Sequence, residues 1–220
     1  MRIATSYLKV FNGILFPFCW LGSIQTMKFT LHNTFPSQTS SESLWILVDS
    51  EQLQNNLNRY QINQLQDVLS ATQYKAGLNE SLPLIANLTV QAHSQLLGLG
   101  KVEELKATKL AKLAQTIIKS SQNKFKQITV DLSALPSEFH SLFVLNLTQA
   151  AYGYDEFKSK KNEFSLETIH LVAAQTTLDD AQLNVLQAVQ SGQNYARDLG
   201  NRPPNICFPE YLADQALALA

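Results

Sequence analysis

The stretch "LLGLGKVEELKATKLAKLAQTIIKSSQNKFKQITVDL" (96–132) contains a predicted strand, a predicted helix and a second predicted strand, in that order. In the helix, 102–121, apolar residues recur at helical spacing while lysines occupy the opposite side. The flanking strands, 94–100 and 127–132, are short, and several of the predicted strands along the chain are nearly continuous in apolar residues, as expected of strands covered on both faces. This alternation of segment types is typical of an α/β layer structure.

The same alternation continues on both sides of this stretch. The further predicted strands are 28–32, 44–49, 83–90 and 166–173, and the further predicted helices are 136–154 and 178–199. Between them, 154–165 is polar and charged, which predicts a surface loop before the last strand. With 220 residues, 45% of them hydrophobic, the chain can bury a core of one sizeable domain.

The last long helix, 178–199, has a readable beginning and a readable face. Thr177 and Asp180 are placed as a capping box at its N-terminus. One side of the helix carries the apolar residues Val185, Val189, Ala196 and Leu199.

A sharp corner follows this helix. Gly200 can adopt the left-handed conformation of a helix C-terminal cap, and Pro203 and Pro204 cannot continue a helix. Pro209 suits the first position of a new helix, although Phe208 before it offers no side-chain acceptor for a cap. We call this corner the elbow, and its residues are Gly200, Asn201, Pro203, Pro204 and Asn205.

Charge and cysteine content narrow the classes of partner and compartment. Lys and Arg total 17 against 18 Asp and Glu, so the net charge of -1 creates no field that would by itself recruit nucleic acid or an acidic membrane. The two cysteines, Cys19 and Cys207, lie far apart in the sequence, which argues against a disulfide framework and favours a reducing compartment. The expected location is the cytoplasm.

The first 26 residues do not fit the pattern of the rest. Arg2 and Lys9 precede an apolar run, as in a secretory signal, but no Ala-x-Ala cleavage site follows and Pro17 interrupts the run. The run is also shorter than the about 20 residues that a membrane-spanning helix needs. We expect translation to begin at Met27, whereas a signal or membrane anchor is the alternative. Intact-mass analysis of the native product separates the two.

Several residue patterns partly match known kinds of chemical site. The segment 96–101, ending in Lys101, could cradle a phosphate at a strand-to-helix turn, but its two glycines are only part of the dinucleotide-binding fingerprint and favour a plain tight turn beside a solvated lysine. The lysines of 101–126 favour a solvated helix face over a nucleic-acid surface. Cys207 has no nearby histidine in the sequence, and no Gly-x-Ser-x-Gly motif occurs.

The histidines do not predict a metal centre. None is spaced from another histidine, cysteine or glutamate as metal ligands are, and the four are His32, His93, His140 and His170. Each is expected to be either hydrogen-bonded within the fold or exposed to solvent. The residues alone therefore predict no catalytic and no metal-binding residue in this chain.

Three segments together carry a resemblance to a known family. "ARDLGNRPPNICFPEYLADQA" (196–216) resembles the junction sequence of the leucyl (cytosol) aminopeptidase family. "YGYDEFKSKK" (152–161) is similar to the segment that precedes this junction, and 96–101 with its helix is similar to the N-terminal domain of that family. The resemblance covers roughly Met27 to Ala220 and leaves 1–26 outside.

The resemblance implies an enzyme of two domains. The first is an α/β domain similar in fold to the macro domains, with a mixed sheet covered by helices on both faces. The second carries two divalent metals, Zn or Mn, which activate water to hydrolyse the first peptide bond of a peptide. Members of the family usually assemble as homo-hexamers. Their metal ligands and catalytic residues lie beyond Ala220, so none is assigned to this chain.

The implied organisation divides the chain into four parts. These are an extension (1–26), an N-terminal α/β domain (27–176), a connecting helix (177–200) and the beginning of the catalytic domain (201–220). We expect a fragment or truncated product that is inactive alone and binds no metal, from a cytoplasmic parent acting on peptides, without a membrane partner. The alternatives are a macro-like module for a nucleotide-type ligand or nucleic acid, and a regulatory subunit that docks on full-length copies.

Overall fold

A computed structural model describes most of the chain after residue 26. The described residues are 27–34, 41–58, 60, 65–84, 93–161 and 163–219, together with the backbone of 10–11 and 14–15. Two compact units contain them. The sheet unit consists of Gln25–Gly153 and Asn162–Gln190, and the elbow unit consists of Met1–Ile24, Tyr154–Lys161 and Ser191–Ala220.

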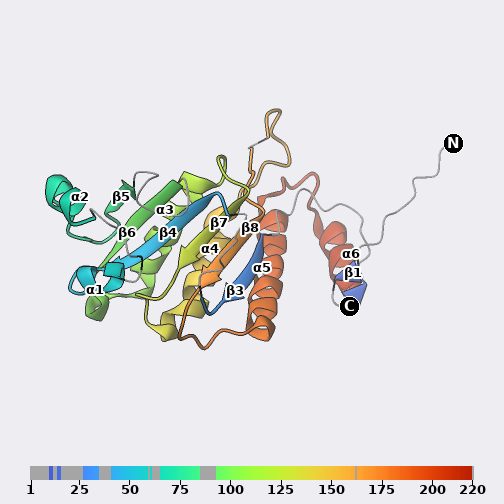
Figure 1. Cartoon of the computed structure of the whole chain (residues 1–220). Coiled ribbons are helices and arrows are strands. Elements are labelled where there is room, and N and C mark those ends of the chain that lie inside the picture. The colour runs from blue at the N-terminus through green and yellow to red at the C-terminus, as the bar shows by residue number, and fades with distance from the viewer. Residues whose placement is uncertain are drawn as a thin grey trace. The chain divides into compact units, whose positions relative to one another are not determined.

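The sheet unit is built on a six-stranded mixed sheet (Figure 1). Its strands, in spatial order, are β3 (Lys28–His32), β8 (Thr168–Val172), β7 (Gln127–Asp131), β4 (Ser43–Asp49), β6 (His93–Gly100) and β5 (Ser81–Leu84). The first five strands run parallel to their neighbours, and only β5 is antiparallel. The predicted strands are confirmed, although residues 85–90 of the strand predicted at 83–90 lie outside the described residues.

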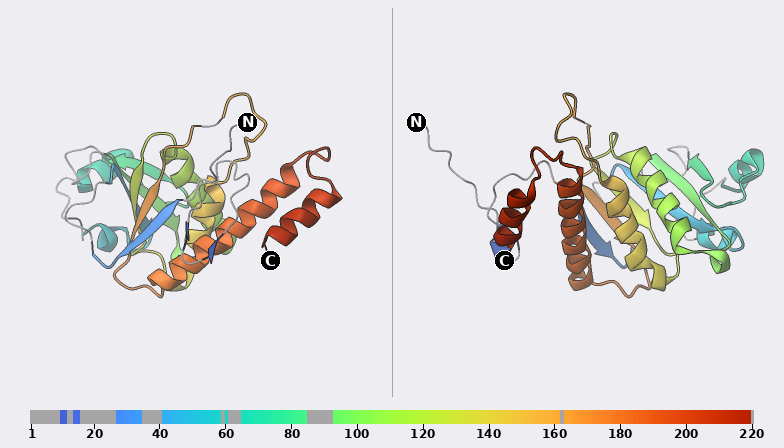
Figure 2. Two further views of the ribbon diagram at one scale, coloured as in Figure 1. Left: turned by 90° about the vertical axis from the view of Figure 1, so that its right-hand side faces the viewer. Right: turned by 180° about the vertical axis from the view of Figure 1, so that it is seen from behind.

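Helices cover both faces of this sheet, as the fold class predicted. On one face, α3 (Ala107–Ser121) and α4 (His140–Ala151) lie side by side (Figure 2, right). Their apolar faces enclose the larger core, in which Trp45 is fully buried and donates its indole N–H to Ser121 Oγ at 3.1 Å. On the other face, α1 (Leu53–Asn58) and α2 (Leu65–Thr72) contribute to a smaller core over β4 and β6.

Two predicted helices each begin with a 3-10 turn in the structure. The turn at Val102–Glu104 is separate from α3, because Leu105 and Lys106 adopt extended backbone angles between them. A 3-10 turn at Ser137–Phe139 leads directly into α4, which ends at Ala151 because the next residue is also extended. Helical periodicity of the side chains does not reveal such interruptions, because they are local choices of backbone conformation.

Helix α5 (Asp180–Asn201) begins differently from the prediction. The Oδ1 atom of Asp179 accepts a hydrogen bond from the backbone N–H of Gln182 at 2.7 Å, which makes Asp179 the N-cap residue. The predicted capping box of Thr177 and Asp180 is therefore wrong. In the turn before the helix, the hydroxyl of Thr176 accepts a hydrogen bond from the N–H of Leu178 at 3.0 Å.

The apolar side of α5 that stands out in the sequence is not its buried face. Val185 is 62% exposed and Val189 is 43% exposed, whereas Leu183 is only 3% exposed and belongs to the larger core. Of the other two residues on this apolar side, Ala196 is exposed and Leu199 is half-buried. The rotation of the helix is set where the chain enters it, because Leu178 and Leu183 are both anchored in the core.

The cap of α5 offers a direct test of this correction. We expect Asp179→Ala to lower the free energy of unfolding by about 1 kcal/mol, because it removes the acceptor of the Gln182 N–H. Thr177→Ala is the matched control and should change it by less than about 0.5 kcal/mol, since an exposed hydroxyl is lost. Urea unfolding followed by circular dichroism measures both. Equal losses of unfolding free energy in the two variants would contradict the assignment of Asp179 as the N-cap residue.

Candidate functional site

The elbow begins one residue later than predicted. Helix α5 continues through Gly200 to Asn201, and the N–H of Arg202 still donates to the carbonyl of Asp198 at 3.1 Å. Gly200 does not have a positive φ angle, so the predicted left-handed cap is wrong. Pro203 follows at once, and it has no N–H with which to extend the helical hydrogen bonds.

The turn of the elbow is closed by a single carbonyl group. Pro203 O accepts the N–H groups of both Ile206 and Cys207 at 2.9 Å. Helix α6 (Pro209–Leu219) then starts with proline in its first position, as predicted. The carbonyl of Phe208 accepts from the N–H of Leu212 at 3.1 Å, and the side chain of Phe208 has no acceptor with which to cap the helix.

A largely buried ion pair joins two segments of the elbow unit. Arg202 Nε donates to Glu156 Oε2 at 3.0 Å, and the two side chains are only 7% and 12% exposed. Arg202 also donates through Nη1 to the hydroxyl oxygen of Tyr211, whose ring centroid lies 5.6 Å from the guanidinium carbon. The hydroxyl of Tyr154 donates to the same Glu156 oxygen at 3.2 Å. We call these four residues the elbow cluster.

The electrostatics of the elbow cluster keep both charges in place. Burial alone would lower the pKa of Arg202, but its hydrogen bond to Glu156 and the charge of Glu156 hold that pKa above its ordinary value. Burial, reinforced by the charge of Glu156, raises the pKa of Tyr154, so this hydroxyl keeps its proton as a donor. A paired, hydrogen-bonded charge of this kind fixes geometry, whereas loss of one partner leaves a buried charge uncompensated.

The elbow cluster joins two segments that are far apart in the sequence. Tyr154 and Glu156 belong to 152–161, whereas Arg202 and Tyr211 belong to 196–216. Sequence reasoning selected both segments but assigned no role to any of the four side chains. Opposite charges beside aromatic residues were the available signal, and nothing in the spacing of two distant segments pairs them.

The glycine turn after β6 has a structural role. Gly98 and Gly100 donate their N–H groups to the carbonyls of Glu80 and Ala76, at 2.9 and 3.1 Å. Gly100 also has a φ angle of +70°, which favours glycine. Because both glycine amides already have backbone acceptors, they are not available to a phosphate, and the plain-turn interpretation is the one the structure supports. Lys101 is exposed and pairs with Glu51 at 2.9 Å.

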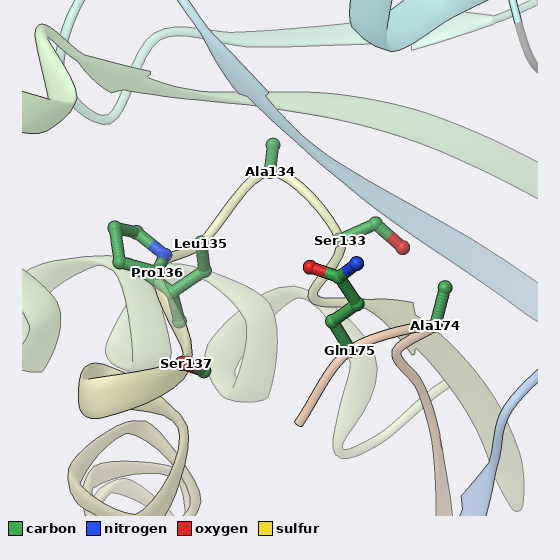
Figure 3. Close-up of a pocket in the computed structure, with 7 residues that line it drawn as sticks. All are labelled: Ser133, Ala134, Leu135, Pro136, Ser137, Ala174 and Gln175. Carbon is green, nitrogen blue, oxygen red and sulfur yellow. The ribbon is translucent and has the colours of Figure 1, made fainter. Parts of the chain in front are cut away.

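A pocket of about 390 Å³ lies beyond the carboxyl ends of β7 and β8 (Figure 3). It is lined by Ser133, Ala134, Leu135, Pro136, Ser137, Ala174 and Gln175. Ligands of open α/β sheets bind at this edge, close to the point where the strand order reverses. None of the seven lining residues carries a charge, so the pocket itself supplies no acid, base or carboxylate ligand.

Asp131, at the end of β7, shapes the first loop of this pocket. Its Oδ1 atom accepts from the N–H and the hydroxyl of Ser133, at 2.9 and 2.6 Å. Its Oδ2 atom accepts from the hydroxyl of Tyr60. The carboxylate is 3% exposed and has a donor at each oxygen, which gives it a role in holding the loop.

His140 connects the two loops of the pocket through its two ring nitrogens. Its Nε2 atom lies 2.9 Å from the carbonyl of Leu135 and its Nδ1 atom lies 2.8 Å from the hydroxyl of Thr176. The side chain is fully buried, and burial lowers its pKa below the ordinary value. His140 is therefore a hydrogen-bonded histidine within the fold, one of the two environments that the sequence predicted.

This burial predicts a pH dependence of stability. The unfolded chain protonates His140 below about pH 6.5, whereas the folded chain does so only at lower pH. The free energy of unfolding should therefore fall as the pH drops below about 6.5, by at most about 1.4 kcal/mol per pH unit from this residue. Urea unfolding at a series of pH values measures it. His140→Gln should flatten the profile and His93→Gln, at an exposed site, should not; identical profiles for all three proteins would contradict the assignment.

The other three histidines have different surroundings. His93 is exposed at the start of β6, with its ring 5.2 Å from that of Phe125. His32 and His170 lie next to each other on β3 and β8, with ring centroids 5.6 Å apart. Burial, and then the charges of His32 and Lys28, lower the pKa of His170. No group of three or more His, Cys, Asp or Glu side chains that could hold a metal occurs among the described residues.

Comparison with known proteins gives consistent results. Residues 47–161, more than half of the chain, match the model of the cytosol aminopeptidase family, N-terminal domain. A "Probable cytosol aminopeptidase" of Acinetobacter baumannii (strain ATCC 17978) is 72% identical over 194 residues, which are 88% of this chain and 40% of the relative. The corresponding protein of Acinetobacter baylyi is 57% identical over the same shares of each chain, and that of Pseudomonas syringae pv. tomato is 35% identical over 66% and 32%.

Solved structures share the fold at low sequence identity. A tomato leucine aminopeptidase mutant superposes with a TM-score of 0.69 at 18% identity, over 89% of this chain and 42% of that protein. A bottromycin maturation enzyme in complex with Mn gives a TM-score of 0.58 at 16% identity, over 80% and 35%. Within the parts of the chain that the structure describes, none of the helices is long and apolar enough to cross a bilayer.

The fold and the comparisons define the class of the chain. It is a mixed α/β domain with the architecture of the N-terminal region of leucine aminopeptidase. The chain belongs to the cytosol aminopeptidase family. It spans about 40% of the length of the Acinetobacter relatives that it matches.

Proposed function

We propose that the chain is the N-terminal portion of a metal-dependent leucyl aminopeptidase, which removes N-terminal residues from peptides in the cytoplasm. The match of residues 47–161 to the N-terminal domain of the family is the observation that carries this proposal. In the whole enzyme, two divalent metals, Zn or Mn, would activate the water that attacks the peptide bond. They would be held by residues outside this chain, in a homo-hexameric assembly.

The elbow acquires a role within this proposal. Residues 27–176 would be the N-terminal domain, 177–200 the connecting helix and 201–220 the start of the catalytic domain. Gly200, Asn201, Pro203, Pro204 and Asn205 would set the direction in which the chain enters that domain. The elbow cluster supports this role, because Arg202 holds the first residues after α5 against Glu156 and Tyr211. These residues would orient the chain and take no part in the chemistry.

The alternative of a nucleotide-binding module finds no support in the glycine turn. The amides of Gly98 and Gly100, which a phosphate would need, are hydrogen-bonded to Glu80 and Ala76. The uncharged lining of the pocket beside β7 and β8 offers no group to pair with a phosphate. We therefore put forward the aminopeptidase role alone.

Hydrolysis of leucine p-nitroanilide tests the proposal. We expect the purified 220-residue chain to release no more nitroaniline than buffer does, with either Mn²⁺ or Zn²⁺ added, because positioning groups and metal are both supplied elsewhere. The 72%-identical relative from Acinetobacter baumannii is the positive control. Hydrolysis by this chain that disappears with a chelator would show that the site lies within these residues.

A further inference from the structure

Two histidines share one hydroxyl oxygen at the edge of the sheet. Thr30 Oγ1 lies 2.7 Å from His170 Nδ1 and 3.1 Å from His32 Nε2. Thr30 and His170 are directly paired across β3 and β8, and His32 is two residues further along β3, on the same face. All three side chains are half-buried, so solvent reaches this group.

The hydrogen-bond partners determine which ring nitrogens of the two histidines carry a proton. His170 Nε2 lies 3.2 Å from Gln127 Oε1, a carbonyl oxygen that can only accept, so Nε2 carries the proton. In the neutral ring, Nδ1 then carries the lone pair and accepts the proton of the Thr30 hydroxyl. The same hydroxyl oxygen is left as an acceptor for the N–H at His32 Nε2.

This arrangement has the features of a metal ligand with its supporting partner. Histidines that bind metals almost always donate the other ring N–H to an oxygen that fixes ring and tautomer, as Gln127 does for His170. A second imidazole nitrogen, that of His32, is directed at the same point and becomes a ligand by changing tautomer. Imidazole suits Zn²⁺, Ni²⁺ and Cu²⁺.

We propose that His32 and His170 form a binding site for a transition-metal dication of the Zn²⁺, Ni²⁺ and Cu²⁺ class. The ion takes the position between the two ring nitrogens that the Thr30 hydroxyl group now bridges, and water completes its coordination. This site is separate from the two catalytic metals of the proposed function, and it stands or falls independently of that function.

The site has a structural consequence for the sheet. β3 is an edge strand that pairs with β8, and the two ligands come from these two strands. A metal bound to both would fasten β3 to the sheet, since its binding energy is lost when the strands separate. Lys28, also on β3, places a positive charge near His170 and opposes the dication.

Isothermal titration of the full chain with Ni²⁺ and Zn²⁺ at neutral pH tests the site. The double variant Cys19→Ser and Cys207→Ser serves as the background, because cysteine thiols would compete for both metals. We expect one ion per chain, and more than about tenfold weaker binding in His170→Gln and in His32→Gln, at least the loss seen when only a supporting partner is removed. His93→Gln, the matched control, should bind as the background does. Lys28→Gln should bind more tightly.

Hydrogen exchange then separates a metal clip from a surface contact. Saturating Zn²⁺ should slow exchange of the β3 amides in the background protein and leave them unchanged in His32→Gln. His32 lies on the edge strand and is half-buried, so this variant keeps the test valid if His170→Gln unfolds. Absence of binding, equal affinity in the histidine variants, or unchanged β3 exchange with metal bound would each overturn the proposal.

Discussion

Arg202→Met is expected to destabilise the elbow by about 3–5 kcal/mol, a large share of the stability of an ordinary domain. The side chain of Arg202 is 7% exposed, and its loss leaves the carboxylate of Glu156, whose side chain is 12% exposed, without its cation. Tyr211 loses its hydrogen-bond donor at the same time. Removing the carboxylate as well, in Arg202→Met with Glu156→Leu, should recover much of the stability, because no unpaired charge remains buried.

Native-state hydrogen exchange measures this effect where it occurs. The amides of Ile206, Cys207 and Leu212 are hydrogen-bonded within the elbow and at the start of α6, so their opening free energies report on the cluster. Lys101→Met is the matched control, since its ion pair with Glu51 is exposed and worth about 1 kcal/mol or less. If Arg202→Met left these amides as protected as in the control, the elbow cluster would have no structural role.

Gly98→Ala is expected to lower the stability of the sheet unit by about 3 kcal/mol or more, at or beyond the upper end of typical overpacking costs. A Cβ atom at this position would lie 2.1 Å from the carbonyl oxygen of Gly77 and 2.5 Å from the carbonyl carbon of Ala76. Both are backbone atoms that cannot rotate away. The hydrogen bonds that Gly98 makes with Glu80 and Asn79, at 2.9 and 2.8 Å, would have to lengthen.

Gly192 provides a control of opposite sign for Gly98. It lies inside α5 with nothing within 4 Å of its Cβ position, so Gly192→Ala should stabilise the protein by about 0.5–1 kcal/mol through backbone entropy. Urea unfolding of the two variants measures both effects. A mild effect of Gly98→Ala, comparable in size to that of Gly192→Ala, would show that the 76–77 backbone yields easily.

The strands were predictable because their signal is local. The segment 44–49 is nearly continuous in apolar residues, as burial on both faces requires, and 127–132 alternates polar with apolar residues, as a strand does. Helix positions were predictable as well, but the rotation of α5 was not. Val185 and Val189 form as good an apolar face as the buried one around Leu183, and only the packing of the chain entering the helix decides between them.

The candidate site was less predictable than the fold. The prolines of the elbow were identifiable from the sequence, because proline restricts the backbone wherever it occurs. The ion pair of Arg202 with Glu156 was not predictable, because residues 46 positions apart have no spacing pattern that marks them as partners. His32 and His170 likewise have no metal-ligand spacing along the chain, and the parallel pairing of β3 with β8 brings them together.

Joining this chain to a catalytic domain shows whether it can serve as the N-terminal part of an aminopeptidase. The chimera would fuse residues 1–220 to the remaining C-terminal part of the 72%-identical relative from Acinetobacter baumannii, at the position that matches Ala220. We expect Mn²⁺- or Zn²⁺-dependent hydrolysis of leucine p-nitroanilide by the chimera and none by the chain alone. A folded chimera without activity, beside an active relative, would contradict the claim that this chain is the N-terminal portion of such an enzyme.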